Sequence, residues 1–273
     1  MASARENPRE FDLIHDQSSS FFRHAAECSA PVLATLHLPR AFYPEELFRT
    51  LPPNLWFNCV SQSQARTFAD LPNLIGVVQN GIALERYPVA TEKHDYLLWL
   101  GRICEEKAPH LAIEAAERAG LPLVIAGQVY PFRYHRDYFE REIHPWVSGG
   151  SSVRFVDSPS FAAKLELLER ARALLLTSAA EETSSLVAME AMACGTPVIA
   201  VRHGAFPEIV ADGETGFIVD TVEEMAPALE DVGRISPQAC RTRVQQQFSA
   251  SRMARQYEGL YRTVLMAAKG LAA

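Results

Sequence analysis

Short apolar runs alternate with stretches of helical periodicity along the chain from Asp95 onward. The apolar runs predict strands at 96–100, 122–126, 153–157, 173–177, 197–201 and 216–219. The stretches between them predict helices at about 109–119, 136–146, 161–171, 184–194 and 205–211. Strands that alternate with helices form a parallel sheet with right-handed crossovers. The fold class predicted here is therefore α/β, doubly wound, and the tail from about 222 to 269 is predicted to be helical throughout.

Composition limits the classes of function. Hydrophobic residues make up 48% of the 273 residues and charged residues 22%, which are ordinary values for a globular protein. The net charge of −7 disfavours a nucleic-acid partner. The polar first ten residues do not read as a signal peptide, and no apolar run approaches the ~20 residues of a membrane span. We expect a cytoplasmic protein; attachment to the inner face of a membrane stays open.

The five cysteines, at positions 28, 59, 104, 194 and 240, have no Cys-x-x-Cys spacing. They are interpreted as buried or free thiols in a reducing compartment.

Two glutamates attract attention because of their surroundings. Glu190 is the only charge in the helical apolar run that contains Leu186, Val187, Met189 and Met192. A helix that is apolar nearly all round is normally buried, and a buried carboxylate needs hydrogen-bond donors. Either a ligand's hydroxyl groups or a nearby Arg or backbone amide can supply them. Glu182 lies eight residues earlier.

The run from Thr177 to Asp220 resembles the nucleotide-sugar site of retaining glycosyltransferases of family 4, which have the GT-B fold of two Rossmann-like domains. The resemblance rests on the pair Glu182-x7-Glu190 and on three further motifs, Gly195-Thr-Pro-Val-Ile-Ala200, Pro207-Glu-Ile-Val210 and Asp212-Gly-Glu-Thr-Gly-Phe217. It implies that Glu182 lies beside the donor sugar and that Glu190 binds the ribose hydroxyls.

A loop after the first of the regular strands carries two cations. Gly101 and Arg102 follow the run 96–100, Lys107 comes five residues later, and a helix is expected from Pro109. Open α/β sheets bind ligands at this carboxyl edge. Arg and Lys both suit a diphosphate, although a solvated loop would contain the same residues. The Gly-Arg-x4-Lys pattern matches the diphosphate site of family 4, which implies that role for Arg102 and Lys107.

The chain departs from the family after the first glutamate. Most members have Gly-Phe-Gly there, whereas this chain has Thr183-Ser184-Ser185, followed by Leu186. Ser and Thr keep the backbone N–H groups of a helix N-terminus and cap it well, so the phosphate site is expected to survive with these four residues in it. The donor preference of the usual motif cannot be transferred.

Further candidates follow other strands. Thr35-Leu36-His37 matches the family's Thr-x-His, which implies that His37 contacts the donor sugar; His15 ends the preceding strand and is a weaker candidate for the same cleft. For both, a hydrogen-bonded loop histidine is the alternative. Gly127 opens an aromatic and basic segment in which Tyr130 or Arg133 could contact the donor, or which is simply a surface loop.

The resemblance also divides the chain. Runs at 11–15, 31–37, 56–61 and 75–78 predict strands that match the second half of a GT-B N-terminal domain. We expect a partial acceptor-side domain at 1–84, a donor domain at 85–250 and a helix at 251–273 that crosses back. At ~30 residues per βα unit, roughly 90 residues of the family's first domain have no counterpart here. Either the gene starts late, or the rest of that domain is on another chain, or the chain is a truncated form.

The resemblance implies a retaining transferase that moves a sugar, UDP-glucose being the commonest donor, to an unknown small molecule, glycan or lipid. A same-face mechanism with help from the leaving phosphate is expected. No cofactor and no metal is expected, because the chain has no Asp-x-Asp triplet. The alternatives are a nucleotide-sugar-binding protein without transfer and a GT-B epimerase. A dinucleotide oxidoreductase is disfavoured because Gly-x-Gly-x-x-Gly is absent.

Overall fold

The computed structural model describes residues 11–150 and 152–271, and the chain divides into two α/β units. The first unit consists of the chain up to Asn80 together with the segment from Ala250, and the second unit is Gly81–Ser249. The boundaries expected from the sequence fall after residues 84 and 250.

Six parallel strands form the sheet of the second unit, in the order β10-β9-β8-β5-β6-β7. Their bounds are β5 Leu97–Leu100, β6 Leu123–Gly127, β7 Val153–Asp157, β8 Ala173–Leu176, β9 Val198–Val201 and β10 Gly216–Val219. Every predicted strand of this unit is confirmed, and the ends agree to within one residue.

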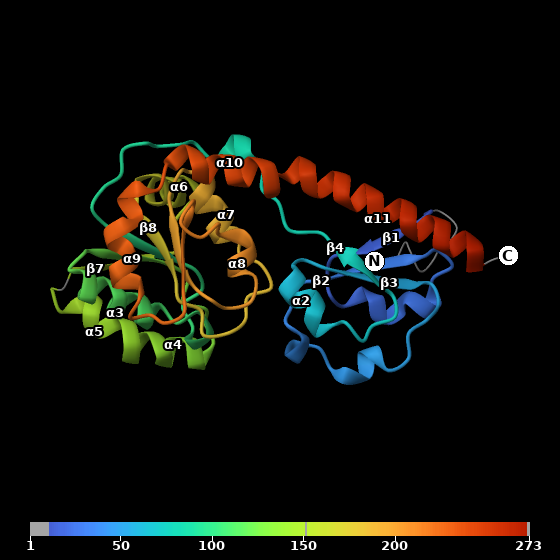
Figure 1. Cartoon of the computed structure of the whole chain (residues 1–273). Coiled ribbons are helices and arrows are strands. Elements are labelled where there is room, and N and C mark those ends of the chain that lie inside the picture. The colour runs from blue at the N-terminus through green and yellow to red at the C-terminus, as the bar shows by residue number, and fades with distance from the viewer. Residues whose placement is uncertain (1–10, 151, 272–273) are drawn as a thin grey trace. The chain divides into compact units, whose positions relative to one another are not determined.

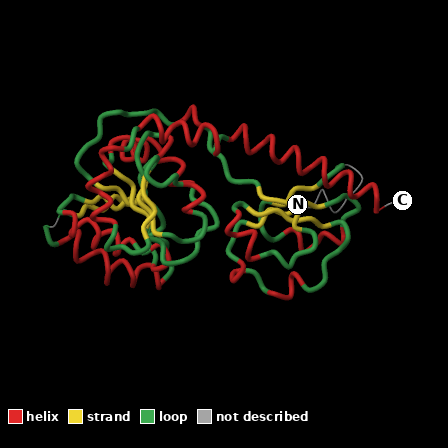
Figure 2. Tube along the Cα trace, viewed as in Figure 1, coloured by secondary structure: helices red, strands yellow, loops and turns green. Residues whose placement is uncertain are grey.

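Helices pack around this sheet in Figures 1 and 2. They are α3 Pro109–Ala119, α4 Arg133–Tyr138, α5 His144–Ser148, α6 Phe161–Arg170, α7 Leu186–Ala193, α8 Phe206–Ile209, α9 Met225–Asp231 and α10 Pro237–Gln247. A π-helical turn, η6 Phe139–Ile143, joins α4 to α5. Short 3₁₀ turns lie at η4 Leu84–Arg86, η5 Glu105–Lys107 and η7 Val232–Arg234.

The tail that was predicted to be helical from about 222 to 269 is helical, but it is divided into several helices with short breaks between them. Helix α9 and the turn η7 end before Ile235, and α10 then starts at Pro237 and ends at Gln247. Proline lacks the N–H that a continuing helix needs, but it suits the first position of a new helix, so Pro237 starts a separate helix.

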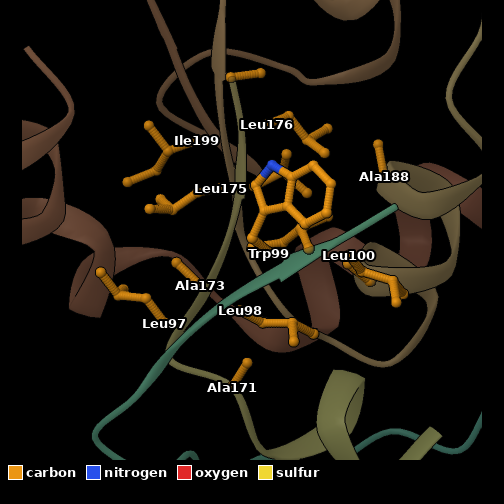
Figure 3. Packing of buried hydrophobic residues seen from close by; sticks show 14 of the residues in the cluster. Leu97, Leu98, Trp99, Leu100, Ala171, Ala173, Leu175, Leu176, Ala188 and Ile199 are labelled. Carbon is orange, nitrogen blue, oxygen red and sulfur yellow. The ribbon is translucent and has the colours of Figure 1, made fainter. Parts of the chain in front are cut away.

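The central strands β5, β6, β8 and β9 are buried on both faces, which explains their continuous apolar sequences. Leu97, Leu98 and Trp99 are at most 2% exposed. Figure 3 shows the Trp99 indole among Leu175, Leu176 and Ala188. Its Nε1 donates to Thr177 Oγ1 at 3.2 Å, just beyond the end of β8. The core thus extends to the sheet edge at which the loops of the site begin.

Four parallel strands form the sheet of the first unit, in the order β1-β2-β3-β4. Their bounds are β1 Ile14–Asp16, β2 Val32–Leu36, β3 Leu55–Cys59 and β4 Leu74–Val77. The first strand starts three residues later than predicted, with Phe11 44% exposed. Ile14 is paired with Val32, and its N–H donates to the carbonyl of Pro31. Proline has no N–H to extend this ladder towards Phe11.

The two faces of this sheet are covered differently. On one face lies the long helix α11, Ala250–Leu271, whose Tyr257 and Val264 pack against Leu33 and Trp56 (Figure 1). On the opposite face lies a second core, which contains Phe22, Phe57 and Phe68. The short elements that cover this face are η1 Phe21–Glu27, η2 Arg40–Phe42, η3 Glu45–Phe48 and α2 Gln62–Thr67. The last helix therefore belongs to the first unit. No helix of the described residues has the length and apolar character needed to cross a membrane.

Candidate functional site

The carboxyl ends of β5 and β8 lie side by side because these strands are parallel neighbours, with Leu97 opposite Ala173 and Leu98 opposite Leu174. Each strand leads into a loop and then a helix, α3 after β5 and α7 after β8. Residues far apart in the sequence therefore meet at one edge of the sheet, where open α/β sheets bind ligands.

Hydrogen bonds hold the two loops together. Thr177 Oγ1 donates to the carbonyl of Ala108 at 2.8 Å, and the N–H of Ala179 donates to the carbonyl of Glu106 at 3.0 Å. Ala108 adopts a left-handed backbone, with φ 49°, directly before α3. Such a conformation is strained for a residue with a side chain, and these contacts with the β8 loop help to maintain it. Lys107 is thereby held next to the β8 loop.

Lys107 and Glu182 form an ion pair across the two loops. Lys107 Nζ donates to Glu182 Oε1, and Ser178 Oγ donates to the same oxygen. The Glu182 side chain is 13% exposed and that of Lys107 is 29% exposed, so the pair is shielded from water more than an ordinary surface pair. Lys107 and Glu182 were expected to bind phosphate and sugar, respectively; in the structure they are partners of each other.

The N-terminus of α7 adjoins this pair. Ser185 is the N-cap, and its hydroxyl accepts from the N–H of Ala188 at 3.2 Å. The Ser184 hydroxyl is buried and has no hydrogen-bond partner among the described residues. A buried polar group without a partner calls for an explanation, and an anion at the helix N-terminus would provide one. Thr183 precedes these serines, and Leu186 is the first helical residue, 49% exposed.

A cavity of about 190 Å³ lies between the two loops. Of the predicted site residues, Gly101, Arg102, Lys107, Glu182 and Ser185 line it. The other lining residues are Trp99, Leu100, Leu176, Thr177, Ser178, Val187 and Phe206. The cavity thus combines an apolar floor with two cations, one carboxylate and a capped helix N-terminus.

Two glycines allow the backbone to pack closely around the site. A Cβ on Gly127 would lie 1.8 Å from the carbonyl oxygen of Gly101, so the β5 and β6 loops touch through two residues without side chains. Gly204 has φ +52°, and a Cβ there would lie 2.2 Å from the carbonyl oxygen of Glu182. The N–H of Ala205 donates to that oxygen at 2.7 Å. The loop after β9 therefore supports the peptide of Glu182.

Glu190 receives its hydrogen bonds from within the protein. The hydroxyl of Tyr87 and Nζ of Lys164 both donate to Glu190 Oε1, each at 2.7 Å. Burial, and secondly the bond to Glu190, raise the pKa of Tyr87, so this phenol stays protonated. The predicted need for donors is thus met by a Tyr and a Lys, which neither alternative named. Both bonds end on Oε1; Glu190 Oε2 has no hydrogen bond within the described residues.

His15 and His37 belong to the first unit, and the geometry here is that of this unit alone. His15 lies within hydrogen-bond distance of the hydroxyls of Thr35 and Tyr261, at 2.8 Å in each case. His37 Nε2 lies 2.7 Å from Gln17 Oε1. Burial lowers the pKa of both imidazoles, against a smaller opposite effect of Asp16. Both rings are therefore neutral at pH 7 and can each donate one N–H.

The aromatic segment after β6 does not line the cavity. Tyr130 packs against Phe132 and His135, with ring centroids 6.3 and 5.8 Å apart. The Arg133 side chain is 90% exposed and lies 3.4 Å from Asp137. In this structure the segment is a short surface turn that leads into α4 and has its own aromatic contacts.

Sequence reasoning missed several residues of the site. Tyr87 and Lys164 are 103 and 26 positions from Glu190, and Phe206 comes from a helix of four residues. Gln17, beside both histidines, belongs to no motif. Ser178 directly follows the β8 run, so the rule that ligand sites lie at the carboxyl edge could have found it.

Comparisons with known proteins found matches over the second unit and over most of the chain. The model of the family described as glycosyl transferases group 1 matches residues 85–242. A D-inositol 3-phosphate glycosyltransferase of Mycobacteroides abscessus is 33% identical over 137 residues, covering 49% of this chain and 31% of that protein. A putative colanic acid biosynthesis glycosyltransferase, WcaL of Salmonella typhimurium, is 24% identical over 280 residues, covering 94% of this chain and 66% of that protein.

Among solved structures, Anabaena Alr3699/HepE in complex with UDP-glucose matches with a TM-score of 0.79 and 18% identity, over 96% of this chain and 81% of that one. At this identity the match concerns the fold. The chain spans less than two thirds of the length of both curated relatives.

We expect Gly204→Ala to destabilise the second unit more than Gly213→Ala does. Both glycines have a positive φ, and no atom lies within 4 Å of the position that a Cβ on Gly213 would take. Gly213→Ala should cost only the ~1–2 kcal/mol of a left-handed residue. Gly204→Ala adds a clash with the Glu182 peptide, worth about 1–3 kcal/mol more. Urea unfolding followed by tryptophan fluorescence measures the difference; equal losses would contradict the close support of Glu182.

Proposed function

Since the chain belongs to the glycosyl transferases group 1 family and has the GT-B type of α/β fold, we propose that it transfers a hexosyl group from a nucleoside-diphosphate sugar to an acceptor with retention of configuration. UDP-glucose is the proposed donor. The observation that carries the proposal is the convergence of Arg102, Lys107, Glu182 and the N-terminus of α7 on one cavity.

The proposed diphosphate site combines the two cations with the helix N-terminus. Arg102 is exposed at the cavity and offers a guanidinium that can bind two phosphate oxygens. The unbonded hydroxyl of Ser184 and the first N–H groups of α7 would donate to the same group. These donors replace a divalent ion between the phosphates in our proposal, so the transfer step itself is taken to be metal-independent.

Lys107 would change partner when the donor binds. In the structure it is bonded to Glu182; a diphosphate carries more negative charge than one carboxylate and would compete for the ammonium. Glu182 would keep the hydroxyl of Ser178 as a donor and become available to the hydroxyls of the sugar. The ion pair thus holds both groups in place before the substrate arrives.

In the proposed reaction the bond between the anomeric carbon and the β-phosphate oxygen breaks, and its electron pair leaves with the diphosphate. The acceptor oxygen attacks from the same face, and its proton passes to the departing phosphate oxygen. Arg102, Lys107 and α7 stabilise the charge that develops there. A double displacement would need a carboxylate nucleophile beside the anomeric carbon, and we assign Glu182 a role on the sugar instead.

Two further contacts are proposed by resemblance. Glu190 Oε2, which has no partner among the described residues, would accept from the ribose hydroxyls while Tyr87 and Lys164 hold Oε1. His37, neutral at pH 7 because burial lowers its pKa, would donate to the donor sugar. His15, held by Thr35 and Tyr261, is proposed by the same resemblance as a weaker candidate for a donor contact.

The first test is donor turnover. The purified chain should release UDP from UDP-glucose, slowly with water as acceptor, and the free glucose should first appear as the α anomer in NMR. Lys107→Ala should lower the rate about 10²–10³-fold, as loss of a preorganised transition-state contact does. UDP binding without any release of UDP would identify a binding protein, and first appearance of β-glucose would exclude retention.

Binding of UDP should depend on both cations. Arg102→Ala and Lys107→Ala should each weaken it by about 1.5–3 kcal/mol, the worth of a hydrogen bond to a charged group. Lys107→Ala should have the larger effect, because it also leaves the charge of Glu182 facing the phosphates. Arg118→Ala is the control, since Arg118 is 51% exposed and pairs with Glu223. Isothermal titration calorimetry measures the affinities; a wild-type value removes the mutated residue from the site.

Glu190 can be tested against its own ion-pair partner. Glu190→Gln and Lys164→Ala both break the pair and should lower the melting temperature similarly. Only Glu190→Gln removes the proposed ribose acceptor, so it should weaken UDP binding about tenfold more than Lys164→Ala does. If both variants bind UDP equally well, Glu190 serves only to hold α6 and α7 together.

A further inference from the structure

Three residues with metal-binding side chains meet beside the diphosphate loop. Cys104 and Glu106 come from the loop after β5, and His135 comes from α4, after β6. One ligand atom from each residue lies within 4.8 Å of the other two. The strands β5 and β6 are paired neighbours, and the N–H of Ile103 donates to the carbonyl of Gln128 at 3.1 Å. The two loops are thus fixed next to each other by the backbone.

His135 carries an independent sign of a ligand. Its side chain is 1% exposed, and Nδ1 is buried without a hydrogen-bond partner among the described residues. A buried polar group in this state costs about 1–3 kcal/mol. Aromatic rings surround the imidazole, with Tyr134 and Phe132 at centroid distances of 4.2 and 5.6 Å. These neighbours orient the ring without satisfying Nδ1, whereas a metal ion bound through Nδ1 would satisfy it.

The chemistry of the three side chains selects the kind of metal. Thiolate, imidazole and carboxylate together are ligands of zinc, whereas Mg²⁺ and Ca²⁺ require oxygen ligands. Tetrahedral zinc bonds place ligand atoms about 3.3–3.8 Å apart. The ligand atoms of the three residues lie up to 4.8 Å apart, which is more than this. Because Glu106 is exposed, a rotation of its side chain can bring its carboxylate closer to the other two ligands. Arg102 acts electrostatically on Glu106 and His135. The two negative charges of a thiolate and a carboxylate exceed its single positive charge, so the site as a whole would attract a cation.

A catalytic thiol is a poorer explanation of the cluster. Cys104 is fully buried, and its thiol donates to the carbonyl of Arg102 at 3.7 Å. Reactive cysteines have the opposite environment, which lowers the pKa of the thiol. Binding to a metal ion would replace the thiol proton directly.

We propose that Cys104, Glu106 and His135 bind one Zn²⁺ ion, with water as the fourth ligand. None of the three is among the described residues that line the cavity, so this ion is separate from the phosphates of a donor. The ion would join the loop that carries Arg102 and Lys107 to the start of α4. The proposal does not depend on the proposed transfer, because binding is measured without a donor.

The test uses the whole chain, reduced and freed of metal with a chelator. Titration with Co²⁺ should give one equivalent bound, with the charge-transfer absorption of a cobalt–thiolate bond, and Zn²⁺ should abolish that absorption. Cys104→Ser should lose the thiolate band, and His135→Asn should lose stoichiometric binding. Glu106→Gln should bind Zn²⁺ at least tenfold more weakly in competition with a chromophoric chelator. Zn²⁺ should raise the melting temperature of the wild type but not that of Cys104→Ser or His135→Asn.

Matched variants guard against indirect effects. Cys240→Ser alters another buried thiol, bonded to the carbonyl of Thr215, and His110→Asn alters another histidine, bonded to Tyr138. Glu105→Gln removes an exposed neighbouring carboxylate. All three should bind Zn²⁺ as the wild type does. If Cys104→Ser does not fold, the cobalt spectrum of the wild type and the Zn²⁺ affinity of the Glu106→Gln variant, altered at an exposed residue, test the proposal instead. Absence of a thiolate band in the wild type, or unchanged affinity in Glu106→Gln, would overturn the proposal.

Discussion

The parallel pairing of β5 with β8 is the constraint on which the site depends. It sets the end of one strand, at Leu100, beside the end of the other, at Leu176. Their loops are then close enough for the bonds between Thr177 and Ala108 and between Lys107 and Glu182, across 69 and 75 positions of sequence. Without this register the two cations and the first glutamate would have no common cavity.

Close backbone contacts then fix the conformation of these loops. Gly127 and Gly204 let neighbouring loops approach Gly101 and the Glu182 peptide to distances that a Cβ would forbid. The left-handed Ala108 starts α3 immediately after Lys107. These features place the charges before any ligand arrives, which lowers the reorganisation that binding requires. The Lys107–Glu182 pair fits this view, since each group keeps the other oriented.

Much of the second unit could be predicted from sequence because its strands are continuous apolar runs and its helices have a different period. The placement of Arg102 and Lys107 followed from the same pattern. The partners of Glu190 did not, because Tyr87 and Lys164 lie in separate elements that only the tertiary fold brings to α7. For the same reason no spacing rule connects Cys104 with His135. The break before Pro237 was visible in the sequence as a helix-starting proline.

A crystal structure of the chain with UDP tests the central claim most directly. The account predicts that the diphosphate lies in the cavity lined by Arg102 and Ser185, that Lys107 Nζ has moved from Glu182 to a phosphate oxygen, and that Ser184 donates its hydroxyl to the same group. UDP bound elsewhere on the second unit, or bound with the Lys107–Glu182 pair intact and Ser184 still without a partner, would contradict it.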